Sequence, residues 1–245
     1  MRMIRTQQNG PILEILIDRP ERRNALTDAM YREIDQALKA ANANPECTAV
    51  ILHGAGGHFT AGNDLSEFQM PQNSRDVGSI AFLHTLADID VPVIASVQGQ
   101  AVGVGVTLLA HCDFVYADQT AVFRLPFVSL GLCPEGASSY LLPRLAGPRL
   151  AAQWLLHAQP FDAAQALEGH LIHSIEDDPL ATARACAKGL AAQPSAALRA
   201  SKRLLKANDR PAVHQVLDAE AAVFFERLKF PEAQAAFQQF FTRKG

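Results

Sequence analysis

One carboxylate, Glu135, stands in a setting that suits proton transfer. It lies in the run Leu130-Gly131-Leu132-Cys133-Pro134-Glu135-Gly136, among apolar neighbours. Residues 99–139 hold only two other acidic residues, Asp113 and Asp118, and we expect a structural hydrogen-bonding role for Asp113. A carboxyl group that burial makes more basic can take and return a proton near neutral pH. A site here would therefore have one acid/base group rather than two, although a helix-capping role for Glu135 stays open at this point.

Two glycine-containing loops could supply hydrogen-bond donors to such a site. In residues 58–65, Gly62 permits backbone angles closed to other residues and can turn the N–H of Asn63 into a pocket. Residues 99–105 follow one predicted strand and open a predicted helix, whose first N–H groups are unpaired. Two donors converging on one oxygen form an oxyanion hole, able to stabilise an enolate by roughly 3 kcal/mol per donor. Glycines at such turns also serve backbone geometry alone, so the residues themselves leave both interpretations open.

Other kinds of chemistry are disfavoured by the same residues. Gly103-Val104-Gly105 lacks the third glycine of a dinucleotide-binding fingerprint, because Leu108 occupies that place. The sequence contains no phosphate-loop Gly-Lys-Ser/Thr, no Gly-x-Ser-x-Gly nucleophile elbow and no HExxH zinc pattern. No two of the four cysteines form a CxxC pair, which predicts reduced thiols, a cytoplasmic protein and no metal site.

Composition limits the partners that this chain can have. With 245 residues, 49% of them hydrophobic, the chain is long enough to bury a substantial core. Its net charge of −3 creates no strong field for nucleic acid or an anionic membrane, so we expect neither as a partner. The longest apolar stretch, residues 101–110, is too short to span a bilayer.

The hydrophobic pattern predicts the elements that would hold the two loops. Apolar runs predict strands at residues 12–18, 49–53, 91–97, 112–117 and 121–127. Thr27 can cap a helix that ends near residue 43, and further helical segments are expected at residues 79–89 and 103–111. After residue 136 the sequence becomes helical and alanine-rich, with helices predicted at residues 178–193, 195–207, 211–228 and 231–243. This order predicts an α/β core with a helical C-terminal part.

Several of these runs together resemble the crotonase (enoyl-CoA hydratase/isomerase) superfamily. The resemblance is close over about residues 10–150 and looser in the helical tail. The matching segments occur in the family's order and are Arg19-Pro20-Glu21-Arg22-Arg23-Asn24-Ala25-Leu26, Phe59-Thr60-Ala61-Gly62-Asn63-Asp64-Leu65, Ala95-Ser96-Val97-Gln98-Gly99-Gln100-Ala101-Val102-Gly103, Cys112-Asp113 and Leu141-Leu142-Pro143-Arg144-Leu145-Ala146-Gly147.

The resemblance implies an α/β fold made of a spiral of ββα units with a helical C-terminal trimerisation region. It also implies an acyl-CoA thioester substrate, whose coenzyme A is part of the substrate so that no separate cofactor is needed, and a homotrimer or a dimer of trimers. We expect residues 1–195 to form the core that binds and reacts, and residues 196–245 the helical region. By the same resemblance, the N–H groups of Asn63 and Val104 would hold the thioester oxygen, and the substrate would be bound by Arg23, Ala25, Ala61, Gly62, Asp64 and Leu65.

One departure from the family pattern narrows the expected reaction. Hydratases of this family carry two glutamates that hold a water, and the matching positions here are Thr107 and Phe127. The segment Pro134-Glu135-Gly136 is instead similar to Δ3,Δ2-enoyl-CoA isomerases of the peroxisomal type, in which that glutamate is the catalytic base. The resemblance therefore implies an isomerase with Glu135 as its acid/base. Another reaction on a CoA thioester, such as hydration, hydrolysis or decarboxylation, and a catalytically silent acyl-CoA-binding subunit remain as alternatives.

Overall fold

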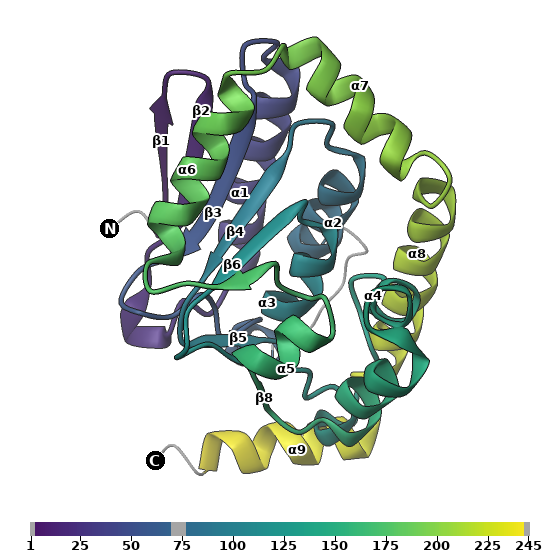
Figure 1. The fold of residues 1–245 in the computed structure, drawn as a ribbon. Helices are drawn as coiled ribbons and strands as arrows, with labels where there is room; N and C mark the ends of the chain where they lie inside the picture. Colours follow the sequence, from purple (N-terminus) through teal and green to yellow (C-terminus); the bar gives the residue numbers. More distant parts are fainter. Residues whose placement is uncertain (1–2, 70–76, 243–245) are drawn as a thin grey trace.

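A six-stranded sheet forms the centre of the computed structural model, which describes residues 3–69 and 77–242 (Figure 1). Its strand order is β1-β2-β3-β4-β6-β9; β1 and β2 are antiparallel, and all the other neighbours in it are parallel. Every residue of β4 is buried, as expected for a parallel strand covered on both faces. The strands are β1 (Ile4–Asn9), β2 (Ile12–Ile17), β3 (Ala49–Gly54), β4 (Val93–Val97), β6 (Phe114–Ala117) and β9 (Ser174–Ile175).

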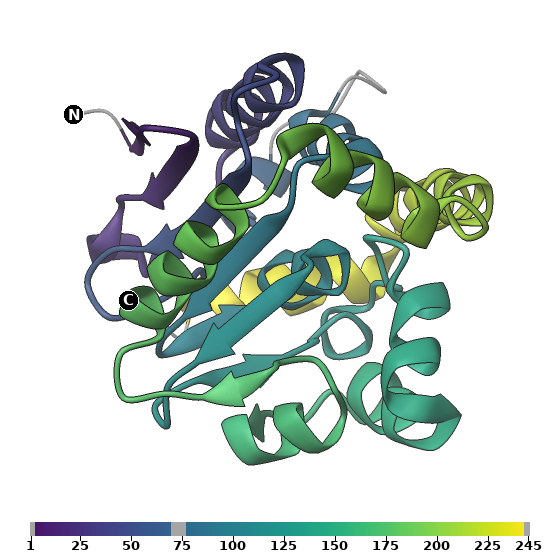
Figure 2. The ribbon, with the colours of Figure 1, turned by 45° about the horizontal axis from the view of Figure 1, so that its top comes forward.

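Helices cover both faces of this sheet. On one face lies α6 (Pro179–Ala191), which buries Ala183 and Ala187 against Ile51 and Ile94. On the other lie α1 (Asp28–Ala43) and α2 (Gly78–Asp88), as Figures 1 and 2 show. The Thr27 hydroxyl caps α1 by accepting the Met30 N–H at 3.3 Å, which confirms the predicted helix start.

A second, three-stranded sheet lies beside the first and leads into the candidate loops. It consists of β5 (Gln100–Val102), β7 (Val122–Arg124) and β8 (Phe161–Asp162), in the order β5-β7-β8. Directly after β5 comes the short helix α3 (Val104–Thr107), and one 3₁₀ turn, η3 (Leu108–His111), continues it. The segment predicted as one helix over residues 103–111 is thus a short α-helix followed by a 3₁₀ turn.

The C-terminal part is helical, as the sequence predicts. It contains α4 (Ser138–Ala152), α5 (Ala163–Glu168), α7 (Ser195–Lys206), α8 (Arg210–Arg227) and α9 (Pro231–Thr242). Shorter turns are η1 (Pro20–Arg22), η2 (Leu65–Gln69), η4 (Val128–Leu130) and the π-helical η5 (Gln153–His157). None of the helices in the described residues is long and apolar enough to cross a membrane.

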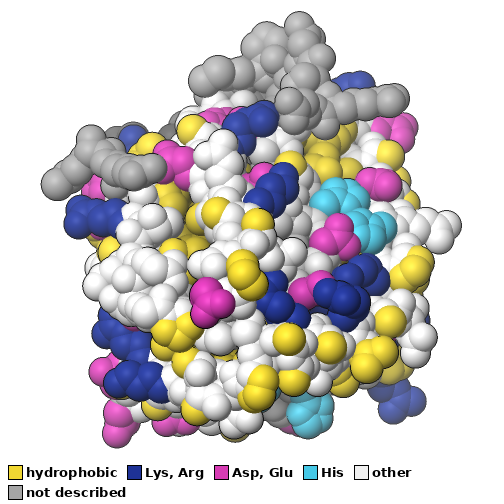
Figure 3. Space-filling view, turned by 90° about the horizontal axis from the view of Figure 1, so that it is seen from above, with side chains coloured by type: hydrophobic (Ala, Val, Ile, Leu, Met, Phe, Trp, Pro, Cys, Tyr) yellow, Lys and Arg dark blue, Asp and Glu magenta, His cyan; other side chains and the backbone are white. Residues whose placement is uncertain are grey.

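Helix α8 is fastened to α2 by a row of polar side chains. The Nδ1 atoms of His84 and His214 lie 2.7 Å apart, and their rings stack with centroids 4.9 Å apart. His84 Nε2 contacts Asp218 at 3.1 Å, and His214 Nε2 contacts Asp88 at 2.7 Å. Figure 3, which views the molecule from above, shows histidine, acidic and basic side chains gathered together on that face. This row fixes the distance between two helices that form the walls of the cavity described below.

Candidate active site

The two glycine-containing loops lie side by side. The Thr60 N–H donates to the Gln100 carbonyl at 2.9 Å, and the Val102 N–H donates to the Thr60 carbonyl at 3.0 Å. A Cβ atom on Gly62 would lie 2.5 Å from the carbonyl oxygen of Val102, and φ at Gly62 is +82°. Glycine therefore lets the loop after residue 60 approach the start of α3.

The N–H groups of Asn63 and Val104, the two expected donors, take no part in regular backbone hydrogen bonding. Around Asn63, the Leu26 N–H donates to the Gly62 carbonyl and the Asp64 N–H to the Leu26 carbonyl, both at 2.8 Å. In a parallel bridge of this kind the N–H of the middle residue, Asn63, takes no part and faces the opposite side. Val104 is the first residue of α3, ahead of the first donors in the helix, so its N–H also lies outside the helical pattern.

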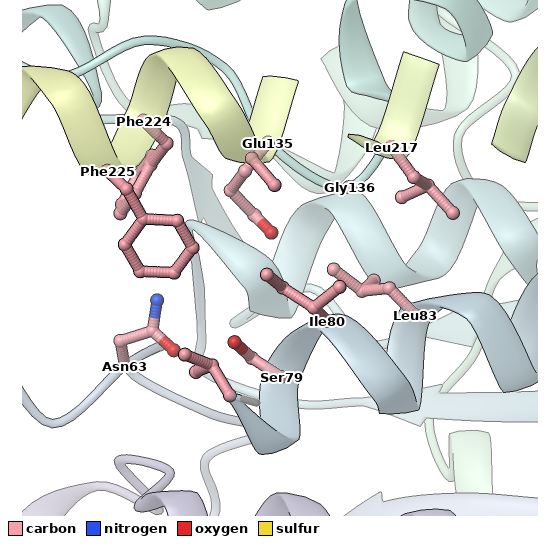
Figure 4. Close-up of a pocket in the computed structure, with 11 residues that line it drawn as sticks. Asn63, Ser79, Ile80, Leu83, Glu135, Gly136, Leu217, Phe224 and Phe225 are labelled. Carbon is pink, nitrogen blue, oxygen red and sulfur yellow. The ribbon is translucent and has the colours of Figure 1, made fainter. Parts of the chain in front are cut away.

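Glu135 faces a narrow cavity close to these loops. The cavity has a volume of about 40 Å³. Figure 4 shows the Glu135 carboxyl group pointing between Ile80 and Phe225, with Asn63 on the far side. Apolar side chains from α2 and α8 make up most of the wall, and the lining residues are Asn63, Val77, Ser79, Ile80, Leu83, Glu135, Gly136, Leu217, Ala221, Phe224 and Phe225. Among the described residues that line it, Glu135 is the only acid.

Burial makes the Glu135 carboxyl more basic. Removal from water raises its pKa to about 8, the Thr107 hydroxyl partly opposes this by donating a hydrogen bond, and the charge of Glu220 adds to the rise. The Thr107 Oγ1–Glu135 Oε1 distance is 2.7 Å, and Thr107 is completely buried. The carboxyl group is thus oriented by a single neutral donor, and its pKa lies where both proton uptake and proton release are easy near neutral pH.

The loop that carries Glu135 is held from behind by close packing. Gly136 has φ of +72°, and a Cβ there would lie 2.6 Å from Thr107 Oγ1, so only glycine fits. His111 Nε2 lies 2.8 Å from the Gly136 carbonyl oxygen. Burial, with help from the Lys206 charge, lowers the pKa of His111 to about 4, so His111 is neutral and donates through Nε2–H. His111 therefore fixes the backbone next to Glu135 without adding charge.

A family model places the chain among known proteins. The model described as enoyl-CoA hydratase/isomerase matches residues 7–244. The chain belongs to the enoyl-CoA hydratase/isomerase family. Its α/β fold with a helical C-terminal region matches the solved structure of an enoyl-CoA hydratase/isomerase from Pseudoalteromonas atlantica, which is 34% identical, with a TM-score of 0.95 over 99% of this chain and 98% of that one.

Several named relatives show the range of this family. The chain is 34% identical to rat enoyl-CoA delta isomerase 2 over 96% of its own length, but it spans only 62% of that relative. It is 31% identical to 1,2-epoxyphenylacetyl-CoA isomerase of Escherichia coli, covering 90% of the chain and 88% of the relative. The solved structure of Pseudomonas aeruginosa OdaA is 38% identical, with a TM-score of 0.94 over 98% of this chain and 99% of that one.

The residues expected to bind substrate gather around the first loop. The Ala61 N–H donates to the Arg23 carbonyl at 2.9 Å, and the exposed Arg23 guanidinium contacts Gln100 at 3.3 Å. Ala25 lies two positions after Arg23, and its carbonyl accepts a hydrogen bond from Arg19 at 3.0 Å. Gly62 stands at the contact with α3 described above, and Leu65 begins η2. All six expected residues thus belong to one connected group of segments.

Asp64 has a structural part in that group. Its Oδ2 accepts a hydrogen bond from Arg19 at 2.8 Å, and its Oδ1 accepts the Ser66 N–H at 3.1 Å. Burial raises the pKa of Asp64, but the hydrogen bonds from Ser66 and Arg19 outweigh it and hold that pKa below its usual value. Asp64 is therefore a fixed anion that shapes its turn rather than a group that exchanges protons.

Sequence reasoning did not find the cavity walls. Phe224 and Phe225, in the helical C-terminal part, line the cavity together with Leu217 and Ala221. The spacing of Leu217, Ala221 and Phe224 predicts that they share one face of a helix, but it does not predict that this face lines a cavity. Phe82 and Leu86 of α2 do not line it: both are fully buried in the core, where Phe82 packs against Tyr31. Within residues 3–69 and 77–242, no three His, Cys, Asp or Glu side chains gather in a way that could hold a metal ion.

Proposed function

We propose that this protein is an acyl-CoA isomerase that moves a double bond from the 3-enoyl to the 2-enoyl position. The observation that supports this most is the single carboxyl group of Glu135, which lines an apolar cavity and has a pKa raised to about 8. Thr107 and Phe127 occupy the places where hydratases of the family carry glutamates. Thr107 hydrogen-bonds to Glu135, and Phe127 is buried, so neither can activate a water for hydration.

Isomerisation needs one base rather than two. Glu135 as carboxylate removes a proton from C2, and the C3=C4 electrons delocalise into a dienolate. The negative charge of that dienolate lies largely on the thioester oxygen, where the N–H groups of Asn63 and Val104 would stabilise it. Protonated Glu135 then returns the proton at C4. No water is added, and coenzyme A serves as part of the substrate.

The remaining expectations belong to the same proposal. The segments around Arg23, Ala25 and Ala61 would hold the coenzyme A portion, and Gly62, Asp64 and Leu65 would shape its path to the thioester. Guanidinium groups bind phosphates well, which favours Arg23 as a contact for the nucleotide end of coenzyme A. We expect the working form to be a homotrimer or a dimer of trimers in the cytoplasm.

Purified protein incubated with a 3-enoyl-CoA tests this proposal. We expect the conjugated 2-enoyl thioester to accumulate, and no 3-hydroxyacyl-CoA to form when 2-enoyl-CoA is supplied instead. Formation of the 3-hydroxy product at a comparable rate would make the protein a hydratase. Binding of both esters without any product would make it a catalytically silent acyl-CoA-binding subunit. Release of free coenzyme A would indicate a thioester hydrolase.

The pH dependence of the reaction follows from the pKa of Glu135. A base must be ionised to remove the C2 proton, and that pKa is raised to about 8. We therefore expect kcat/KM to rise about tenfold per pH unit below that value and to level off above it. Steady-state rates between pH 5.5 and 9.5 check this, and a profile already flat from pH 6 upward would contradict it.

Replacing Thr107 by valine is expected to move the same profile upward in pH. The hydroxyl lowers the pKa of Glu135 by donating to its carboxylate, so the pKa should rise further when that donor is lost. Loss of orientation should also reduce the plateau rate about tenfold. Thr48→Val is a matched control, because Thr48 is also a buried threonine but hydrogen-bonds to the Pro11 carbonyl. A profile that moves in both variants would contradict the assignment.

A further inference from the structure

A second buried carboxylate, Glu220 of α8, lies behind the candidate site. Its residue is only 8% exposed. Oε1 accepts the Ser139 N–H at 2.9 Å, and Oε2 is buried with no hydrogen-bond partner among the described residues. A buried carboxylate costs free energy unless its charge is compensated or used. The reaction proposed above gives Glu220 no part.

The position of Glu220 connects the cavity wall with the loop that carries Glu135. Leu217 and Phe224, three residues before and four after Glu220, line the cavity, so Glu220 shares their face of α8. Its partner Ser139 is in the first turn of α4, and the N–H of the adjacent Ser138 donates to the Glu135 carbonyl at 3.2 Å. The Glu220 carboxylate therefore contacts the first turn of α4, which the short segment 136–137 joins to Glu135.

Glu220 is the better site of the two for a negative charge. It lies at the N-terminus of α4, whose first segment, residues 138–146, ends at a kink at Gly147 and presents N–H groups and a dipole that favour an anion. Burial raises the pKa of Glu220, and the hydrogen bonds from Ser139 and the neighbouring N–H groups oppose that rise. Glu135 has one neutral donor, the Thr107 hydroxyl. When two buried carboxyl groups interact through their charges, the one with more hydrogen-bond donors ionises first, and its charge then favours the protonated form of the other.

Within the part of the chain that the structure describes, three other ionisable groups near Glu135, those of Tyr31, Cys133 and His111, carry no charge near neutral pH. Burial raises the pKa of Tyr31, on α1, well above its usual value, and burial raises the pKa of Cys133 to about 11. Burial lowers the pKa of His111 to about 4. The cavity residues that α2 contributes are Val77 at its start and Ser79, Ile80 and Leu83, none of which is ionisable. Among these neighbours, Glu220 is the one formal charge that acts on Glu135, and its effect is to raise the pKa of Glu135.

We propose that Glu220 is a positioning residue for the reaction: it ties the first turn of α4, which directly follows the Glu135 loop, to α8, and its negative charge keeps the proton on Glu135. The inference rests on the proposed function insofar as Glu135 is the proton shuttle. Its consequence is that the C-terminal helical region sets the pH range in which the core works. Removing this charge should make Glu135 ionise at lower pH, while making it a weaker base.

Glu220→Gln separates charge from structure, because a glutamine oxygen can still accept the Ser139 N–H. We expect the inflection of kcat/KM to move down by roughly half a pH unit. Activity at pH 6, taken relative to the variant's own plateau, should then rise roughly threefold over wild type. Glu220→Asp keeps the charge and should keep the wild-type inflection even where it costs stability. Glu226→Gln, a change of an exposed glutamate on the same helix, is the matched control and should leave the profile unchanged.

Direct titration of Glu135 makes the inference independent of turnover. Protein labelled with ¹³C at the glutamate side-chain carboxyl carbons is followed by NMR across pH, and the Glu135 signal is assigned by its loss in Glu135→Gln.

A lower midpoint in Glu220→Gln, together with unchanged midpoints in Glu220→Asp and Glu226→Gln, supports the role. An unchanged midpoint in folded Glu220→Gln overturns it, as does an equal shift in Glu226→Gln. Should Glu220→Gln not fold by itself, Glu220→Gln stabilised by a bound CoA ester is compared with wild type bound to the same ester, and an unmoved midpoint there also overturns the role. A shifted midpoint without any isomerase activity would reject the proposed function and leave the charge effect standing.

Discussion

Replacing Glu135 by glutamine is expected to lower the isomerisation rate by about 10²- to 10⁴-fold, the range for loss of a general acid/base. Glutamine keeps the size of the side chain and can still accept the hydrogen bond that Thr107 donates at 2.7 Å. It cannot take the C2 proton, so both proton transfers fail together. Affinity for a CoA ester should stay within about twofold, because the carboxyl group makes no contact that binding requires in the proposed reaction. Rates with 3-enoyl-CoA and calorimetric binding measure the two effects separately.

The matched control for this change is Glu168→Gln, since Glu168 is an exposed glutamate at the end of α5. It should leave both rate and affinity unchanged. Retained full activity in Glu135→Gln would remove the assignment of the base. Equal loss of binding and turnover would show instead that Glu135 mainly supports the shape of the cavity.

The same substitution has a predictable effect on stability across pH. The pKa of Glu135 is raised from 4.5 to about 8 by burial first, so the folded state holds a proton that the unfolded state has already lost between those values. The free energy of unfolding therefore falls as pH rises from about 4.5 to about 8 and is level above that. Glutamine has no such dependence, so the variant should gain stability relative to wild type as pH rises through this window. Melting temperatures at pH 5 and pH 8.5 compare the two proteins.

The core could be predicted from the sequence because its signals are local. Continuous apolar runs gave β3 and β4, and the capping residue Thr27 gave the start of α1. Strand β1 was missed, because five of its six residues are exposed and polar at the edge of the sheet. The two-residue strands β8 and β9 are too short to carry any periodic pattern.

The site was predictable only in part, because its geometry depends on contacts between distant segments. The likeness of Pro134-Glu135-Gly136 to the isomerases pointed to the carboxylate, but not to Thr107 as its partner. The direction of the Asn63 N–H comes from pairing with Leu26, which lies 37 positions away in sequence. Glu220 lies 85 positions from Glu135, and no spacing rule links the two. Local patterns thus pointed to the candidate acid/base group, whereas its electrostatic surroundings became visible only in the fold.

Replacing Gly103 by alanine is expected to lower kcat by about 10²- to 10³-fold, the cost of one lost oxyanion-hole donor. Gly103 precedes α3 with φ of 56° and ψ of −118°, a conformation that essentially only glycine adopts. The nearest atom to an added Cβ would be Phe127 Cε1 at 3.9 Å, so the Cβ has room and the strain comes from the backbone angles alone. An alanine would turn the peptide that leads to Val104 and move its N–H away from the thioester oxygen. Stability should fall by about 1–3 kcal/mol from the same strain.

Gly10→Ala separates strain from catalysis. Gly10 also has a positive φ, +59°, with no atom within 4 Å of an added Cβ, and it lies in the turn between β1 and β2. That variant should lose about 1–2 kcal/mol of stability and keep its full kcat. A Gly103→Ala protein with the same stability loss and an unchanged kcat would show that the Val104 N–H does not bind the oxyanion. A lower kcat with nearly unchanged affinity for the ester would instead locate the lost interaction in the transition state, where a dienolate needs it.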